Sequence, residues 1–154
     1  MRGKPVKKRQ LESDLVYKSK VVTRMVNTVM KSGKKSTAER IVYAVLGKLA
    51  SDPKEATVLF EEAVRNVMPK QEVRSRRVGG ATYQIPYPLK HERAEALAVR
   101  WIVKAAKKKA GKDMSTGLLE ELKNAKDGVG DAIKKRDDTH KMAEANRAFS
   151  HFRL

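Results

Sequence analysis

Apolar residues recur at three- and four-residue spacing along most of this 154-residue chain, and this period limits the fold more than any other feature. Such spacing gathers apolar side chains on one face of an α-helix, and the chain is long enough to bury them in one core. The pattern predicts a mainly α fold with six helices. Four lie at about 20–31, 36–49, 53–68 and 91–110, a fifth holds Leu118, Leu119, Leu122 and Ala125, and the last follows Asp131 and ends at about residue 149.

Several predicted helix ends carry recognisable sequence signals. Ser36 and Glu39 have the spacing of a capping box, which predicts that the second helix begins after Ser36. Asp52, followed by a proline, predicts the N-cap of the third helix. Gly111 suits the C-terminal cap of the fourth helix, and Asp131 suits the N-cap of the last.

One segment, at about 72–88, changes from helical period to alternation and predicts a protruding β-hairpin. The Gly79-Gly80 pair at its centre admits the positive φ angles of a tight turn. An isolated hairpin is marginally stable in water, so either its apolar side rests on the helices or a partner completes it. Alternation places three residues on one face, which suits either docking on the domain or stacking on bases: Tyr83, Ile85 and Tyr87.

Positive charge is in excess and is unevenly distributed. The chain has 35 lysines and arginines against 18 aspartates and glutamates, a net charge of +17. Residues 1–18 lack apolar periodicity and begin with a basic run, which predicts a basic N-terminal arm followed by a helical domain at 19–154. A second acid-free basic run lies at 100–112, whereas acids gather at 52–62 and 120–121. This segregation favours a polyanionic partner such as a nucleic acid.

The fourth predicted helix carries both an apolar stripe and a basic face. Trp101 lies on the stripe, which favours packing in the core over stacking on a base. At 100° per residue, five basic side chains fall on an adjoining face: Arg93, Arg100, Lys104, Lys107 and Lys108.

No residue pattern indicates catalysis or a cofactor. The chain has no cysteine, which excludes disulfides, thiol catalysis and thiolate zinc sites. His91, His140 and His151 lack metal-ligand spacing, and residues 32–36 fail the P-loop pattern. Neither a secretory signal nor an apolar run of membrane-spanning length occurs. The sequence therefore predicts a cytoplasmic, non-enzymatic protein without a metal, a cofactor, a small-molecule substrate or a membrane partner.

Two long stretches carry a resemblance to a known family, namely residues 72–86 (EVRSRRVGGATYQIP) and 134–149 (KKRDDTHKMAEANRAF). Shorter matches lie at 33–39, 62–69 and 93–101, so the resemblance spans nearly the whole chain. On these residues the chain resembles the bacterial small-subunit ribosomal protein number seven family. The resemblance implies a six-helix domain with a protruding hairpin and a basic N-terminal arm.

The same resemblance implies a function in translation, within the small ribosomal subunit. It implies primary binding to the 3′ major domain of the rRNA, nucleation of head assembly, and a place at the subunit interface near the exit-site tRNA. Neighbouring small-subunit proteins numbered nine and eleven are implied partners. By position, the implied rRNA contacts are Arg2, Lys4, Lys7, Lys8, Arg9, Lys34, Lys35, Arg74, Arg76, Arg77, Arg93, Arg100, Lys104, Lys134, Lys135 and Arg136. The residues implied to face tRNA or neighbouring proteins are Gly79, Gly80, Tyr83 and Arg147.

Three other functions fit parts of the sequence. The basic hairpin with Pro86 could enter the minor groove of DNA as an architectural element. A ribonuclease could use one of the three histidines. The basic helix at 93–108 could lie on a membrane surface, although its apolar stripe is needed for the core.

Overall fold

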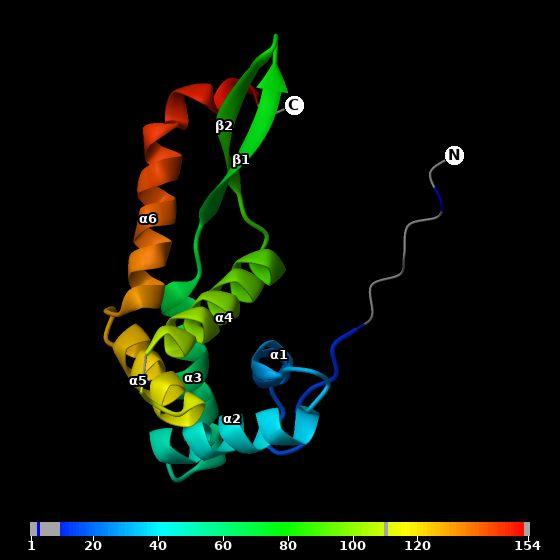
Figure 1. Ribbon diagram of the computed structural model, residues 1–154, viewed down its shortest axis with the longest axis vertical. Helices are drawn as coiled ribbons and strands as arrows, with labels where there is room; N and C mark the ends of the chain where they lie inside the picture. Colours follow the sequence, from blue (N-terminus) through cyan, green and yellow to red (C-terminus); the bar gives the residue numbers. More distant parts are fainter. Residues whose placement is uncertain (1–2, 4–9, 110, 153–154) are drawn as a thin grey trace.

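The computed structural model describes residues 3, 10–109 and 111–152, and over these residues it consists of a helical body with a long extension (Figure 1). The body contains five helices: α1 (Lys20–Val29), α2 (Lys35–Leu49), α3 (Pro53–Val67), α4 (His91–Lys108) and α5 (Met114–Lys126). The extension contains strands β1 (Gln71–Val78) and β2 (Ala81–Pro88), helix α6 (Asp131–Ala145) and the 3₁₀-helix η1 (Arg147–Phe152). The predicted fold class, mainly α with one β-hairpin, is confirmed.

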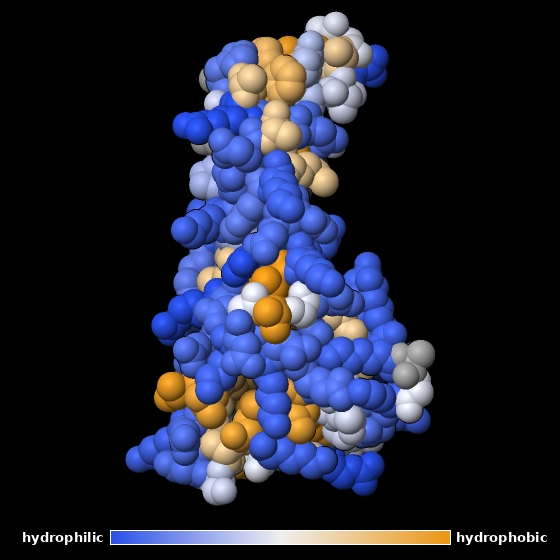
Figure 2. Space-filling model, turned by 90° about the vertical axis from the view of Figure 1, so that its left-hand side faces the viewer, coloured by the Kyte–Doolittle hydropathy of each residue, from blue (hydrophilic) through white to orange (hydrophobic). Residues whose placement is uncertain are grey.

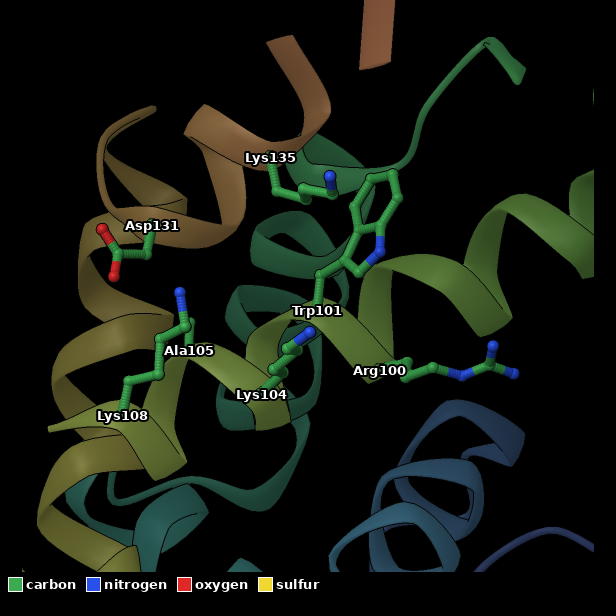
Figure 3. Close-up of a pocket in the computed structure, with 7 residues that line it drawn as sticks. All are labelled: Arg100, Trp101, Lys104, Ala105, Lys108, Asp131 and Lys135. Atoms are coloured by element: carbon green, nitrogen blue, oxygen red, sulfur yellow. The ribbon is translucent and has the colours of Figure 1, made fainter. Parts of the chain in front are cut away.

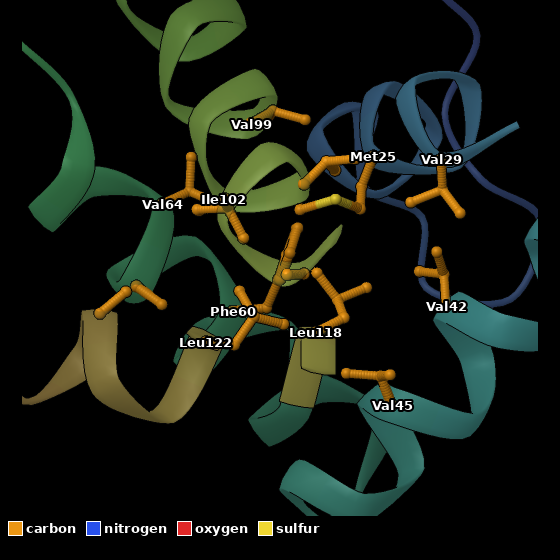
Figure 4. Packing of buried hydrophobic residues seen from close by; sticks show 14 of the residues in the cluster. Met25, Val29, Val42, Val45, Phe60, Val64, Val99, Ile102, Leu118 and Leu122 are labelled. Carbon is orange, nitrogen blue, oxygen red and sulfur yellow. The ribbon is translucent and has the colours of Figure 1, made fainter. Parts of the chain in front are cut away.

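The core lies where α1 to α5 meet. Phe60 of α3 is 1% exposed and is surrounded by Met25, Ile102, Leu118 and Leu122 from three other helices (Figure 4). These positions belong to the apolar stripes that the sequence period predicts. Burying one such side chain contributes about 1.5–3 kcal/mol, so the stripes account for the assembly of the body.

A glycine allows α5 to approach α4 closely. A Cβ atom on Gly117 would lie 2.9 Å from the backbone oxygen of Ala106, which is closer than Cβ atoms normally come to an oxygen. Glycine is therefore the residue that fits at this crossing.

The hairpin forms as predicted and is docked on other elements. Strands β1 and β2 pair antiparallel, and the turn glycines Gly79 and Gly80 have φ angles of +56° and +91°. Ile85 is fully buried, and the ring of Tyr83 lies 5.2 Å from that of Phe149 in η1. Helix α6 runs along the hairpin, and η1 covers the side of β2 (Figure 1). Of the two possibilities for this face of the hairpin, docking is the one observed.

Helix α6 begins one residue earlier than the sequence predicts. Gly130, with φ +103°, is the N-cap, and the predicted cap Asp131 is the first helical residue. The carboxylate of Glu121, 1% exposed on α5, accepts the backbone N–H of Ala132 at 2.9 Å. Because a side chain from the preceding helix satisfies this terminal N–H, Asp131 is not needed as a cap.

Three other predicted helix ends were also wrong, whereas Asp52 caps α3 as predicted, accepting the N–H of Lys54. Helix α2 begins at Lys35, so Ser36 lies within its first turn, and no side chain caps it among the described residues. Helix α4 ends at Lys108 with Lys109 as C-cap, so Gly111 lies beyond the cap. Helix α6 ends at Ala145, because the chain tightens there into η1, where helix to about residue 149 was predicted.

Within the described part of the chain, no helix combines the length and the apolarity needed to cross a membrane.

Candidate nucleic-acid interface

A basic surface forms where α4 passes the start of α6. On α4, Leu97, Ala98 and Ile102 face the core, whereas Arg100 and Lys104 are exposed. Helix α6 contributes basic side chains from its first turns. Together the two helices line an open cavity of about 290 Å³, and its residues are Arg100, Trp101, Lys104, Ala105, Lys108, Asp131 and Lys135 (Figure 3). The structure thus brings together three predicted rRNA contacts, namely Arg100, Lys104 and Lys135.

Trp101 is partly buried and has two different surroundings. It packs against the core, as its place on the apolar stripe predicts, and it also lines the cavity. In Figure 3 the indole rises from α4 toward Lys135, Lys108 points toward Asp131, and the Arg100 side chain extends the other way, toward α1. The sequence period found the core contact of Trp101 but missed its exposure to a cavity, because the cavity depends on where α6 lies.

At the base of the hairpin one carboxylate binds two arginines, Arg74 of β1 and Arg93 of α4. Glu72 accepts hydrogen bonds from Arg74 Nε at 2.8 Å and from Arg93 Nη2 at 3.2 Å. Burial raises the pKa of Glu72, but the hydrogen bonds from both arginines outweigh it and hold that pKa below its usual value. Glu72 therefore stays ionised near neutral pH and orients both guanidinium groups. Arg74 also lies 5.5 Å from the centre of the Tyr87 ring.

The other two hairpin arginines differ in exposure. Arg76 is partly buried and donates from Nη1 to the backbone oxygen of Phe152 at 2.9 Å, whereas Arg77 is exposed. Arg136 on α6 likewise donates to the backbone oxygen of Asn66 at the end of α3, at 2.5 Å. Part of the hydrogen-bonding capacity of Arg76 and Arg136 is thus used within the protein.

The remaining predicted contacts are spread over the surface. Lys34 and Lys35 are exposed at the start of α2, where Lys35 lies 3.7 Å from Glu39, and Lys134 is exposed on α6. Arg147 is exposed and pairs with Glu144 at 3.2 Å. Gly79 and Gly80 form the exposed hairpin tip, and Tyr83 packs on η1. The predicted arm contacts, Arg2, Lys4, Lys7, Lys8 and Arg9, lie outside the described residues.

The last residues of the predicted arm are attached to α2 by a hydrogen bond. Asp14 accepts the backbone N–H groups of Val16 and Tyr17, both at 3.0 Å, and the hydroxyl of Tyr43 at 2.7 Å. Burial and the hydrogen bond to Asp14 raise the pKa of Tyr43 to about 12. Residues 14–17 therefore have a defined attachment, while the division into 1–18 and 19–154 stays a prediction.

The histidines contact separate parts of the molecule. His140 Nε2 accepts the backbone N–H of Lys70 at 3.0 Å, and His151 Nδ1 lies 2.8 Å from the oxygen of Ala148. His91 Nδ1 lies 3.9 Å from Glu95. Among the residues that the structure covers, no group of histidines and carboxylates could hold a metal ion.

Known proteins match the chain along nearly its entire length. The family model described as ribosomal protein S7p/S5e matches residues 1–147. The small ribosomal subunit protein uS7 of Thioalkalivibrio sulfidiphilus is 51% identical over 146 residues, covering 95% of this chain and 94% of its own. Proteins of the same name from Fervidobacterium nodosum and Pelagibacter ubique are 51% and 47% identical, covering 99% of this chain and 99% and 98% of their own. These relatives are named as ribosomal proteins and not as enzymes, in agreement with the prediction from sequence. The chain therefore belongs to the ribosomal protein S7p/S5e family.

Proposed function

We propose that the chain is a primary rRNA-binding protein that nucleates assembly of the head of the small ribosomal subunit. As a member of its family it is a structural constituent of that subunit, in the cytoplasm, and it binds rRNA. The finer assignments belong to the proposal: the 3′ major domain as its rRNA target, and exit-site tRNA and the small-subunit proteins numbered nine and eleven as its neighbours.

One observation carries the proposal. The cavity between α4 and α6 is lined by Arg100, Lys104, Lys108 and Lys135 and by one acid, Asp131. Cations gathered around one cavity create a local positive potential, which attracts phosphates at close spacing. A structured RNA presents such phosphates where strands meet at junctions, and the cations around this cavity would neutralise them.

The extension supports the proposal by its shape and its charge. The hairpin reaches well beyond the helical body, with α6 beside it (Figure 1), and the surface of this narrow extension is mostly hydrophilic in the view of Figure 2. Arg74 and Arg77 are exposed on β1. Arginine binds phosphate through two parallel hydrogen bonds and also stacks on bases, so it suits a projection that enters folded RNA.

The assignment of residue roles is part of the same proposal. The basic residues that we assign to rRNA are Arg2, Lys4, Lys7, Lys8, Arg9, Lys34, Lys35, Arg74, Arg76, Arg77, Arg93, Arg100, Lys104, Lys134, Lys135 and Arg136. Gly79 and Gly80 at the hairpin tip, and Arg147 and Tyr83 near it, we assign to the side facing tRNA and neighbouring proteins.

Footprinting tests the proposal. The protein should protect a limited set of nucleotides in a transcript of the 3′ major domain, and excess random-sequence duplex DNA should not remove that protection. A transcript of a different rRNA domain, of equal length, is the matched control and should show no comparable protection. Equal binding to duplex DNA would instead favour the DNA-architectural alternative.

A further inference from the structure

The cavity between α4 and α6 has an aromatic wall as well as charges. We propose that it binds one unpaired nucleobase of a single-stranded RNA segment, stacked on Trp101, while the flanking phosphates contact Lys104, Lys108 and Lys135. This inference rests on the rRNA binding proposed above and names the element of RNA structure that the cavity recognises.

The size of the cavity suits one base. Its volume is about 290 Å³, just below the range of roughly 300–1,000 Å³ seen for sites that hold larger, drug-sized ligands. The small side chain of Ala105, four residues after Trp101 and on the same helix face, leaves space beside the indole.

The indole is placed to stack. Trp101 packs against the core on one side, which fixes the ring, and it is only partly buried, so it also lines the cavity (Figure 3). A fixed aromatic ring loses little conformational freedom on binding. Any of the four bases can stack on such a ring. The base must, however, be unpaired and separated from its neighbours in the RNA.

The charges define the rest of the ligand. Lys104 and Lys108 come from consecutive turns of α4, and Lys135 comes from the facing side of α6. Lysines from two helices beside one aromatic ring match a nucleotide whose base enters the cavity while its 5′ and 3′ phosphates remain outside. Asp131, toward which Lys108 points, sits at one end of the cavity (Figure 3).

The chain contains one tryptophan, so its fluorescence reports on this cavity alone. Two probes are compared, an oligoadenylate of about ten nucleotides and an RNA duplex of about ten base pairs. The oligoadenylate should quench the fluorescence in a saturable way, with the dissociation constant that anisotropy gives for an end-labelled copy. The duplex should bind without quenching, because its bases are stacked and paired.

Two variants separate stacking from packing. Trp101→Phe keeps an aromatic face and should bind oligoadenylate within a few-fold of the original protein. Trp101→Leu keeps an apolar side chain but no ring, and should bind about 5- to 150-fold more weakly. Thermal unfolding followed by circular dichroism checks that both variants are folded, and Lys48→Gln, at an exposed position of α2, should leave binding unchanged.

Failure of this inference is distinguishable from failure of the proposed function. If labelled oligoadenylate binds while the fluorescence stays constant, or if the duplex quenches equally, the base-binding cavity is wrong and rRNA binding stands. If the Leu variant is unstable, the quenching of the original protein still decides. If neither oligoadenylate nor the 3′ major domain binds, both proposals are wrong.

Discussion

Arg76 in β1 donates a hydrogen bond from Nη1 to the backbone oxygen of Phe152, 76 residues further along the chain, at 2.9 Å. The Tyr83 ring on β2 lies 5.3 Å from the Phe152 ring. The C-terminal 3₁₀-helix is thereby attached to both strands of the hairpin. This attachment, together with α6, holds the hairpin as one unit with the C-terminal segment.

Replacing Arg76 should loosen this unit without unfolding the body. Arg76→Ala removes a hydrogen bond from a charged donor, worth about 1.5–3 kcal/mol in a partly buried site. We expect faster amide hydrogen exchange in β1, β2 and η1, with the helical circular dichroism retained. Arg77→Ala, at the exposed neighbouring position, is the control and should leave the exchange unchanged. If β1, β2 and η1 exchange at the same rates in Arg76→Ala as in Arg77→Ala, the role given to Arg76 is wrong.

The buried carboxylate of Glu121 should contribute more to the free energy of unfolding than that of its neighbour Glu120. Glu121→Ala leaves the N–H of Ala132 without its acceptor and removes one of the two carboxylates beside Lys109, whose Nζ lies 3.4 Å from Glu121 Oε2 and 3.3 Å from Glu120 Oε2. We expect the free energy of unfolding in urea to fall by about 2–4 kcal/mol. Glu120→Ala removes a carboxylate that is 40% exposed and leaves Lys109 paired with Glu121, so it should have a much smaller effect. Equal losses would show that Glu121 is not a structural cap.

Substitution by alanine should change the stability of the protein in opposite directions at two glycines. Gly117→Ala places a Cβ atom 2.9 Å from the backbone oxygen of Ala106, so α4 and α5 must move apart, at a cost of about 1–3 kcal/mol. Gly47→Ala in α2 meets nothing within 4 Å and should increase stability by about 0.5–1 kcal/mol. Denaturant unfolding measures both. A stabilising Gly117→Ala would show that the helix crossing is loosely packed.

Stability should depend on the protonation of His140. Burial lowers its pKa, the positive charges of Arg136 and Lys70 lower it further, and Asp137 partly opposes them. The folded protein thus binds this proton less readily than the unfolded chain, so stability rises with pH. The contribution is complete above the unfolded pKa, about 6.5, and is lost as pH falls toward the lower folded pKa.

The measurement is the free energy of unfolding between about pH 7.5 and pH 5. His140→Gln should flatten the pH dependence over this window, whereas replacement of the exposed His151 by glutamine should not. The surroundings include Lys141 and Glu144, which line the same cavity as His140. An unchanged pH profile in His140→Gln would remove His140 as the cause.

Local patterns in the sequence predicted the helices and the hairpin turn well. The apolar stripes that contain Met25, Phe60 and Ile102, on three different helices, all face one core, and Gly79-Gly80 forms the turn as expected. Helix ends were less predictable, because tertiary contacts compete with local signals. Asp131 is a residue type that often caps helices, yet it is the carboxylate of Glu121, from α5, that accepts an N–H at this helix terminus.

Contacts between distant residues could not be predicted from period or spacing. Helical geometry placed Arg100 and Lys104 on one face, but the approach of Lys135 depends on how α6 packs against α4. The pairing of Arg76 with Phe152 likewise depends on the path of the chain after α6. The interface was therefore predicted as a set of basic residues, and its cavity became visible only in three dimensions.

The salt dependence of binding to the 3′ major domain tests the central claim most directly. With about 6–10 phosphate contacts, affinity should fall about 10³- to 10⁵-fold between about 50 and 200 mM salt. Replacing both Lys104 and Lys135 by glutamine should reduce the slope of log K against log salt by about 1.4–1.8, whereas replacing the exposed Lys48 and Lys54 should leave it unchanged. A slope that is the same in both double variants would contradict phosphate binding by the α4–α6 surface.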